Sequence, residues 1–172
     1  IFYSTHVRSL TSVRDDGFIM IDNKHFWQTK TLDQLSTDEW ESLCDGCGLC
    51  CLVKIEDENH GDVYNTSVAC RQLDIETCRC RDYENRLEEV SMCIQVTKDN
   101  VAQLDWLPET CAYRRLHAGK QLPEWHPMIT GDKTSVHDAG VSVRWFAFSE
   151  EYVHPEQLEE FILVDEGEVN DD

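Results

Sequence analysis

The chain has 172 residues, and its 34 acidic residues outnumber 15 basic ones, which gives a net charge of −19. Such a negative surface repels a phosphate backbone, and no basic cluster with interleaved aromatic residues offsets it, so we expect no nucleic-acid partner. No apolar run approaches the roughly 18 residues of a membrane span, and the N-terminus lacks a signal-peptide pattern, so we expect no membrane partner and a cytoplasmic location.

The sequence divides into three regions. Residues 1–25 show no clear hydrophobic period and are predicted to be a poorly ordered N-terminal extension. Residues 26–163 contain all nine cysteines and form the predicted cysteine-cluster metal-binding domain. Residues 164–172 end an acidic stretch, because Ser149 to Asp172 includes ten Asp or Glu and no Lys or Arg. Blocks of like charge favour solvation and this stretch has no cysteine, so we expect Ser149 to Asp172 to be dispensable for metal binding.

The first predicted element of the domain is a helix with a capping box. Ser36 stands at the N-cap, and Glu39 follows at the third helical position. The next apolar positions share one helical face: Trp40, Leu43, Cys44 and Cys47. This spacing predicts a helix that presents two cysteines at its C-terminal end. Glycines at positions 46 and 48 then break the helix and allow a tight wrap of the backbone.

Two strands followed by two helices are expected in the middle of the chain. Leu52–Glu56 and Val63–Val68 are predicted strands, with a turn over residues 59–62 between them. Asp99–Trp106 is a predicted helix. Pro108 suits the first position of a further helix that runs to about His117 and closes at the following glycine.

The C-terminal part is predicted to hold one loop, one strand and one helix. Leu122–Lys133 contains two prolines and a glycine and is expected to be a loop anchored by His126. Val141–Phe148 alternates in side-chain character and is a predicted strand. Pro155–Leu163 is a predicted amphipathic helix that docks on the domain. The predicted fold class is therefore α+β: a small single domain, loop-rich around the cysteines, with short helices and a small antiparallel sheet.

The cysteines carry the strongest chemical signal. Four of them fall within eight residues, at Cys44, Cys47, Cys50 and Cys51. A C-x-x-C spacing lets two sulfurs reach one ion, and glycine relieves the crowded turn. An odd number of cysteines cannot all pair as disulfides, which are in any case rare in a reducing cytoplasm. The cofactor expected is zinc or iron, the latter including an iron–sulfur cluster.

Cys50 and Cys51 are adjacent, which leaves two alternatives open. Their side chains diverge in a strand or a helix, so they are poorly placed to chelate one mononuclear ion together. Either one of them is a ligand and the other packs in the core, or they serve two neighbouring centres. Nine cysteines can supply two four-ligand sites with one left over.

The later cysteines extend the candidate site. A C-x-C pair in a strand would place Cys78 and Cys80 on one face, where nearby arginines would offset the charge of thiolates. Cys93 could be a ligand or a core residue, and Cys111, on the predicted Pro108 helix, slightly favours the core. No pair of histidines has metal-binding spacing. The candidate metal ligands are therefore Cys44, Cys47, Cys50, Cys51, Cys70, Cys78, Cys80 and Cys93.

Several motifs together resemble the YcgN family of bacterial cysteine-cluster proteins. The resemblance covers about Phe26 to Phe148, and its motifs are Phe26-Trp27-Gln28-Thr29-Lys30, Leu43-Cys44-Asp45-Gly46-Cys47-Gly48-Leu49-Cys50-Cys51, Cys70-Arg71-Gln72-Leu73, Thr77-Cys78-Arg79-Cys80, Thr110-Cys111-Ala112-Tyr113-Arg114 and Trp125-His126-Pro127. It implies zinc or iron chelation. Leu87 follows Arg86 where many members have proline, which leaves the role of Cys93 open.

Three functions remain in view from the sequence. The first is a protein whose cysteine thiolates hold zinc or an iron–sulfur centre. The second is an iron–sulfur-dependent enzyme that modifies another protein, because a flagellin lysine N-methylase carries a similar cysteine motif. The third is a redox or metal-buffer protein. The sequence predicts neither a particular protein partner nor an oligomeric state.

Overall fold

The structure is a computed structural model that describes residues 12–13, 19–20 and 25–163. Strands β1 (Ser12–Val13) and β2 (Ile19–Met20) pair antiparallel. The predictions of a poorly ordered extension over 1–25 and of an acidic tail over 164–172 otherwise lie outside the described residues. None of the helices in the described ranges is long and apolar enough to cross a membrane.

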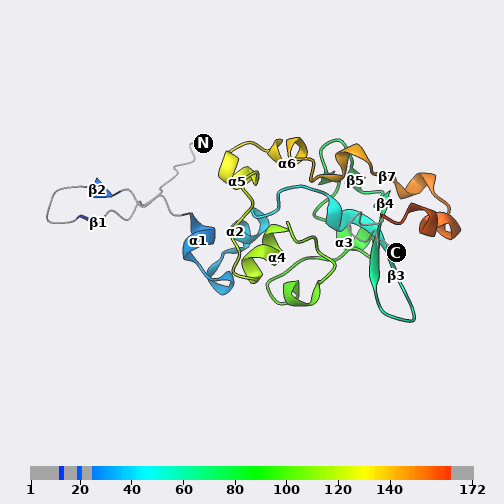
Figure 1. Ribbon diagram of the computed structural model, residues 1–172, viewed down its shortest axis with the longest axis horizontal. Coiled ribbons are helices and arrows are strands. Elements are labelled where there is room, and N and C mark those ends of the chain that lie inside the picture. The colour runs from blue at the N-terminus through cyan, green and yellow to red at the C-terminus, as the bar shows by residue number, and fades with distance from the viewer. Residues whose placement is uncertain (1–11, 14–18, 21–24, 164–172) are drawn as a thin grey trace, which may run out of the picture.

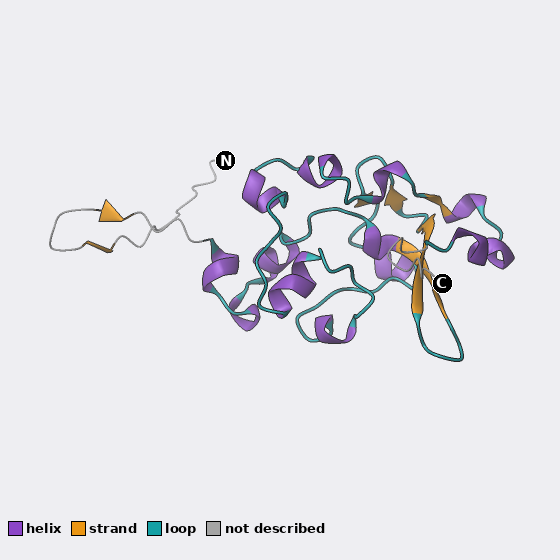
Figure 2. Ribbon diagram, viewed as in Figure 1, coloured by secondary structure: helices purple, strands orange, loops and turns teal. Residues whose placement is uncertain are grey.

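Short helices and long connections make up most of the fold (Figures 1 and 2). The α-helices are α1 (Phe26–Thr29), α2 (Thr37–Glu41), α3 (Arg86–Glu89), α4 (Ala112–His117), α5 (Pro127–Thr130) and α6 (Ser135–Asp138). The 3₁₀ helices span Leu32–Gln34, Leu49–Cys51, Val101–Gln103, Val143–Trp145, Glu150–Tyr152 and Pro155–Phe161. Loops dominate around the cysteines, as predicted.

Two small sheets complete the described fold. β3 (Leu52–Glu56) and β4 (Val63–Ala69) form the predicted antiparallel pair, and β7 (Phe148–Ser149) adds to β4 in parallel. β5 (Leu73–Asp74) pairs antiparallel with β6 (Arg79–Cys80). The α+β class is confirmed, although the three-stranded sheet is mixed rather than purely antiparallel.

The helix predicted to present two cysteines is shorter than its apolar period suggested. The capping box is confirmed, because the Ser36 hydroxyl accepts from the Glu39 N–H at 3.1 Å and the Glu39 carboxylate accepts from the Ser36 N–H at 2.8 Å. The helix nevertheless ends at Glu41, where the Ser42 hydroxyl donates to the Glu39 carbonyl and competes with the helical ladder. Cys44 and Cys47 therefore lie in a loop.

Other predicted elements also changed in length or type. Asp99–Trp106 contains only one 3₁₀ turn, the helix expected from Pro108 begins at Ala112, and Leu122–Lys133 includes α5. The predicted strand Val141–Phe148 is wrong for most of its length, because it forms a 3₁₀ turn before the two-residue β7. The segment from Pro155 is 3₁₀ rather than α-helical, yet it docks as expected, with its end bridging Ile162 to Thr66 of β4.

Two apolar clusters organise the domain, and the cysteine loop connects them. The first contains Trp27, Leu35, Trp40, Leu43, Val101, Leu107, Ala112, Tyr113 and Leu122. The second contains Leu52, Ala69, Leu73, Cys78 and Val143, with Leu49 and Cys51 packed against it. Residues 44–51 run from the first cluster to the second, along the cyan segment that follows α2 in Figure 1.

Candidate metal centre

Two glycines shape the loop that holds the first cysteines. Gly46 and Gly48 have φ of +80° and +77°, a left-handed conformation that other residues adopt only at a cost. A Cβ atom at Gly46 would lie 2.7 Å from the guanidinium carbon of Arg79, and one at Gly48 would lie 2.7 Å from a methyl group of Val143. Backbone conformation therefore favours glycine at both positions. Close packing also requires glycine at Gly48, whereas the flexible Arg79 side chain can move away from Gly46.

Hydrogen bonds from distant parts of the chain hold this loop. Buried His126 accepts the Met128 N–H through Nδ1 and donates from Nε2 to the Leu43 carbonyl, at 3.1 Å in each case. This confirms the predicted anchoring role of His126. The Val143 N–H donates to the Cys47 carbonyl at 2.8 Å, and the buried Asp45 carboxylate accepts from the Cys47 N–H at 2.9 Å. The cysteine positions are therefore set by tertiary contacts.

Four cysteines line one small cavity beside the first apolar cluster. Its volume is about 40 Å³, and Cys44, Cys47, Cys50 and Cys111 contribute to its wall. The remaining wall is mainly apolar and includes Val96, Leu107, Pro108 and Tyr113. Cys111 arrives from the N-cap of α4, far along the chain from the other three. Its placement at the cavity was not anticipated, because the local sequence around Cys111 suits core packing equally well.

The surroundings of this cavity raise the pKa of each of its four thiols. Burial raises the pKa of Cys44 to about 12, and the negative charges of Cys50 and Asp45 add to the effect. Burial also raises the pKa of Cys111 to about 11 and that of Cys47 well above its ordinary value. The pKa of Cys50 is raised first by its contact with the Cys51 thiol and then by burial. A cation that displaces these protons would relieve the mutual repulsion of the thiolates.

Cys51 packs against the second apolar cluster, whereas its neighbour Cys50 lines the cavity. The two adjacent sulfurs are 4.0 Å apart. Cys51, Cys70, Cys80 and Cys93 are each half-buried. The Cys70 N–H donates to the Cys51 carbonyl at 2.9 Å, and Cys80 pairs with Leu73 across β5 and β6. The adjacent cysteines thus belong to different surroundings.

Cys78 differs from the other cysteines. It has a positive φ of 53° and lies just before β6, so the expectation that Cys78 and Cys80 share one face of a strand is wrong. Its thiol is buried among Leu73 and Val143 of the second cluster and donates to the Ile75 carbonyl at 3.4 Å. Its role as a ligand stays a prediction, and its surroundings are those of a packed apolar residue.

The sulfurs line their cavity without converging on one point. Across the ranges that the structure describes, no three Cys, His, Asp or Glu side chains are already grouped closely enough to hold a metal ion. A metal ion at this cavity therefore has to draw the thiols inward. A change of χ1 rotamer moves a cysteine sulfur by roughly 3 Å, which is the scale of adjustment that side chains alone can supply.

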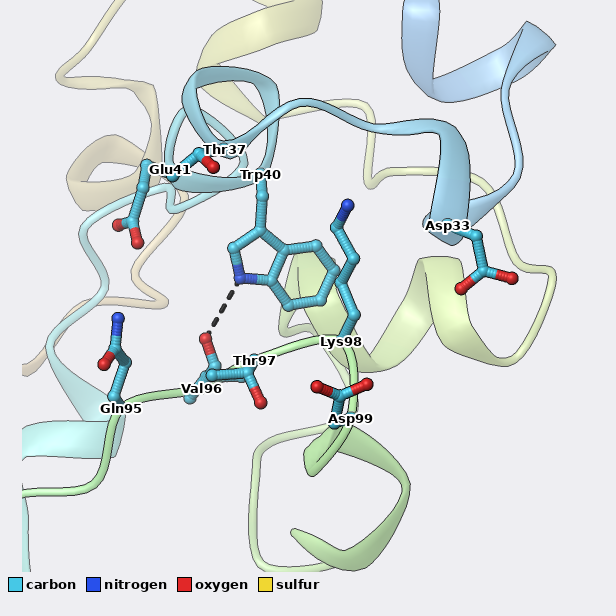
Figure 3. Close-up of a pocket in the computed structure, with 9 residues that line it drawn as sticks. All are labelled: Asp33, Thr37, Trp40, Glu41, Gln95, Val96, Thr97, Lys98 and Asp99. Carbon is cyan, nitrogen blue, oxygen red and sulfur yellow. Dashed lines mark hydrogen bonds between the residues drawn. The ribbon is translucent and has the colours of Figure 1, made fainter.

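A larger groove of about 310 Å³ lies next to the cysteine cavity and shares Val96 with its wall (Figure 3). Most of its lining residues are polar or charged, and none of them is a cysteine. The indole N–H of Trp40 donates to the Val96 carbonyl at 3.0 Å, and the Lys98 ammonium donates to the Leu35 carbonyl. These bonds hold the segment around Val96, which is also part of the cysteine cavity.

Comparison with known proteins places the cysteines in a recognised domain. Residues 43–112 match the CxxCxxCC family model, whose description is "Putative zinc- or iron-chelating domain". A UPF0260 protein of Caulobacter sp. (strain K31) is 53% identical over 147 residues, which cover 85% of this chain and 91% of the relative. UPF0260 proteins of Nitrobacter hamburgensis and Azotobacter vinelandii are 57% and 53% identical, covering 75% and 83% of this chain and 71% and 95% of those relatives. No solved structure matches the chain.

Proposed function

The chain belongs to the UPF0260 family, and on that basis we propose that it is a metal-binding protein in which Cys44, Cys47, Cys50 and Cys111 hold one zinc or iron ion. The observation that carries the proposal is the common cavity lined by these four side chains. Thiolate sulfur is a soft ligand that prefers zinc or iron to calcium or magnesium, and four thiolates complete a tetrahedral site.

The size of the cavity favours a single ion over an iron–sulfur cluster. Its volume is about 40 Å³, whereas a water-sized body needs roughly 10–15 Å³ measured in the same way. The space thus suits an ion that the sulfurs close around. A cubane of four irons and four sulfides would require the apolar wall of Leu107 and Tyr113 to move outward.

Charge supports a cation at the same place. Four thiolates and a divalent ion leave a net negative centre. The Arg79 guanidinium lies 3.9 Å from the Cys44 sulfur and offsets part of that charge. The Asp45 carboxylate is buried beside the loop, and one of its oxygens has no hydrogen-bond partner among the described residues. This extra negative charge further favours a bound cation over four neutral thiols.

A site with four cysteine ligands has no open coordination position, which is typical of structural rather than catalytic metal centres. The ion would join the loop after α2 to the start of α4, and structural zinc supplies about 10–16 kcal/mol in small peptides. This is comparable to the net stability of a whole domain. The need for reduced thiols also supports a cytoplasmic location.

The test is metal analysis of protein purified without oxygen. We expect zinc or iron in the native chain, and loss of the metal bound at this site in Cys47→Ser. Cys78→Ser is the matched control, because Cys78 is equally buried but lies outside the cavity. Full metal content in Cys47→Ser would refute the proposal. Acid-labile sulfide with a visible spectrum that bleaches on reduction would instead support the iron–sulfur alternative, on which an enzymatic role depends.

A further inference from the structure

We propose that Cys51, Cys70, Cys80 and Cys93 form a second cysteine-bound metal centre beside the first. The inference rests on the proposed function, because it assigns the same thiolate chemistry to a second set of ligands. It also chooses between the two alternatives that the adjacent Cys50 and Cys51 leave open. In this arrangement the two residues serve neighbouring centres, and each supplies one sulfur to its own.

The first argument is the pairing of β3 with β4. Leu52 lies opposite Ala69 in this antiparallel pair, so the residues just outside it, Cys51 and Cys70, are also opposite each other. The Cys70 N–H donates to the Cys51 carbonyl at 2.9 Å, which extends the ladder by one step. The sheet register therefore brings together two cysteines that are distant in sequence.

The second argument is the hairpin that follows Cys70. The chain turns at once, since the Leu73 N–H donates to the Cys70 carbonyl at 2.9 Å. Leu73 then pairs with Cys80 in the β5–β6 ladder, and the Arg81 N–H donates to the Gln72 carbonyl at 2.8 Å. Cys80 is thereby held beside the turn that starts at Cys70.

The third argument is the return of the chain after α3. The Arg71 guanidinium donates to the Glu89 carbonyl at 2.6 Å, which ties the end of this helix to the residue next to Cys70. A turn follows, in which the Cys93 N–H donates to the Val90 carbonyl at 2.9 Å. These bonds return the chain that carries Cys93 toward Cys70. As at the first cavity, no three of these side chains are grouped closely enough to hold an ion in the described residues, so the ion has to draw them together.

The two sets meet at the Cys50–Cys51 step, whose sulfurs are 4.0 Å apart.

The two proposed centres and one packed residue account for all nine cysteines. Four line the first cavity, Cys51, Cys70 and Cys80 lie at the β3–β4 and β5–β6 ladders, Cys93 lies in the turn after α3, and Cys78 is packed in the second apolar cluster. The second ion would fasten two hairpins and the turn after α3. The second apolar cluster has five buried residues, whereas the first has nine. The elements around the second cluster are therefore held less firmly by apolar packing.

The experiment is a Co²⁺ titration of the reduced, chelator-stripped full chain under anaerobic conditions, with a competing chelator present. Tetrahedral thiolate ligation gives Co²⁺ strong visible bands, so each centre can be counted. We expect two equivalents in the native chain and in Cys78→Ser, and one equivalent each in Cys47→Ser, Cys80→Ser and Cys93→Ser. Two different ligands of the second centre are tested so that a folding defect in one variant does not decide the result.

The outcomes separate the two proposals. One equivalent in the native chain, lost in Cys47→Ser but kept in Cys80→Ser and Cys93→Ser, would overturn the second centre and leave the first intact. No binding in the native chain would overturn both. Mass spectrometry after thiol alkylation gives an independent readout, because Co²⁺ should protect Cys70, Cys80 and Cys93 in Cys47→Ser. Failure to protect them there would also overturn the second centre.

Discussion

Gly48→Ala tests whether the cysteine loop is held as tightly as its contacts indicate. The residue has φ of +77°, and the left-handed conformation costs an L-residue about 1–2 kcal/mol. The new methyl group would also lie 2.7 Å from a methyl group of Val143, which is fully buried and β-branched. Overpacking of this kind costs about 1–3 kcal/mol. We therefore expect Gly48→Ala to lower the free energy of unfolding by about 2–5 kcal/mol in total.

Gly131→Ala is the matched control for this change. Gly131 has φ of +74°, but a Cβ atom there would meet nothing within 4 Å, so only the conformational cost of about 1–2 kcal/mol applies. Urea denaturation of both variants measures the difference, which isolates the contact with Val143. Equal losses in the two variants would refute the claim that Val143 packs tightly against the loop. A third variant, Gly48→Ala with Val143→Ala, should recover part of the difference by making room for the added methyl group.

Three further predictions follow from other contacts. In chelator-stripped protein, the pKa of about 12 for Cys44 and about 11 for Cys111 exceeds the unfolded value of roughly 8.5. The folded state then keeps protons that the unfolded chain loses. The stability from these buried thiols is therefore fully present below about pH 8.5 and falls as the pH rises toward the folded-state pKa values. Melting temperatures that rise over this range would contradict the burial of these thiols. Trp40→Phe removes the hydrogen bond to Val96 and should cost about 1 kcal/mol in urea denaturation; an unchanged stability would show that water replaces the indole. Deleting residues 165–172 should leave metal content and melting temperature unchanged, whereas truncation at Ser149 should lower the melting temperature, because it removes the contact between Phe161 and Phe148 and the bridge to β4.

Each of the two proposed centres would stabilise a different region of the domain. The first would close the region between α2 and α4, where aromatic packing such as that of Trp40 against Tyr113 already contributes. The second would close the region around the small sheets, where the apolar cluster is smaller. Selective loss of either metal should therefore loosen one part of the domain more than the other. Hydrogen exchange on Cys47→Ser and Cys80→Ser would detect that asymmetry.

The sequence by itself determined the features that depend on near neighbours. The capping box at Ser36 and Glu39, the strand pair β3 and β4, and the left-handed glycines of the loop all follow from residues a few positions apart. The α+β class and the family also follow from the sequence, because the C-x-x-C-x-x-C-C motif and its flanking residues are specific. These signals are local, so no knowledge of the rest of the chain was needed to interpret them.

Only the tertiary structure decided how the cysteines are distributed. Cys111 joins the first cavity because α4 begins beside the loop after α2, and Cys78 is enclosed by Val143 from a segment that alternation had wrongly suggested was a strand. The helix expected to present Cys44 ended early because side chains and distant backbone groups took over the bonds that would have extended it. Which thiols share a site depends on contacts between residues far apart in the chain, and residue spacing within one segment carries no record of those contacts.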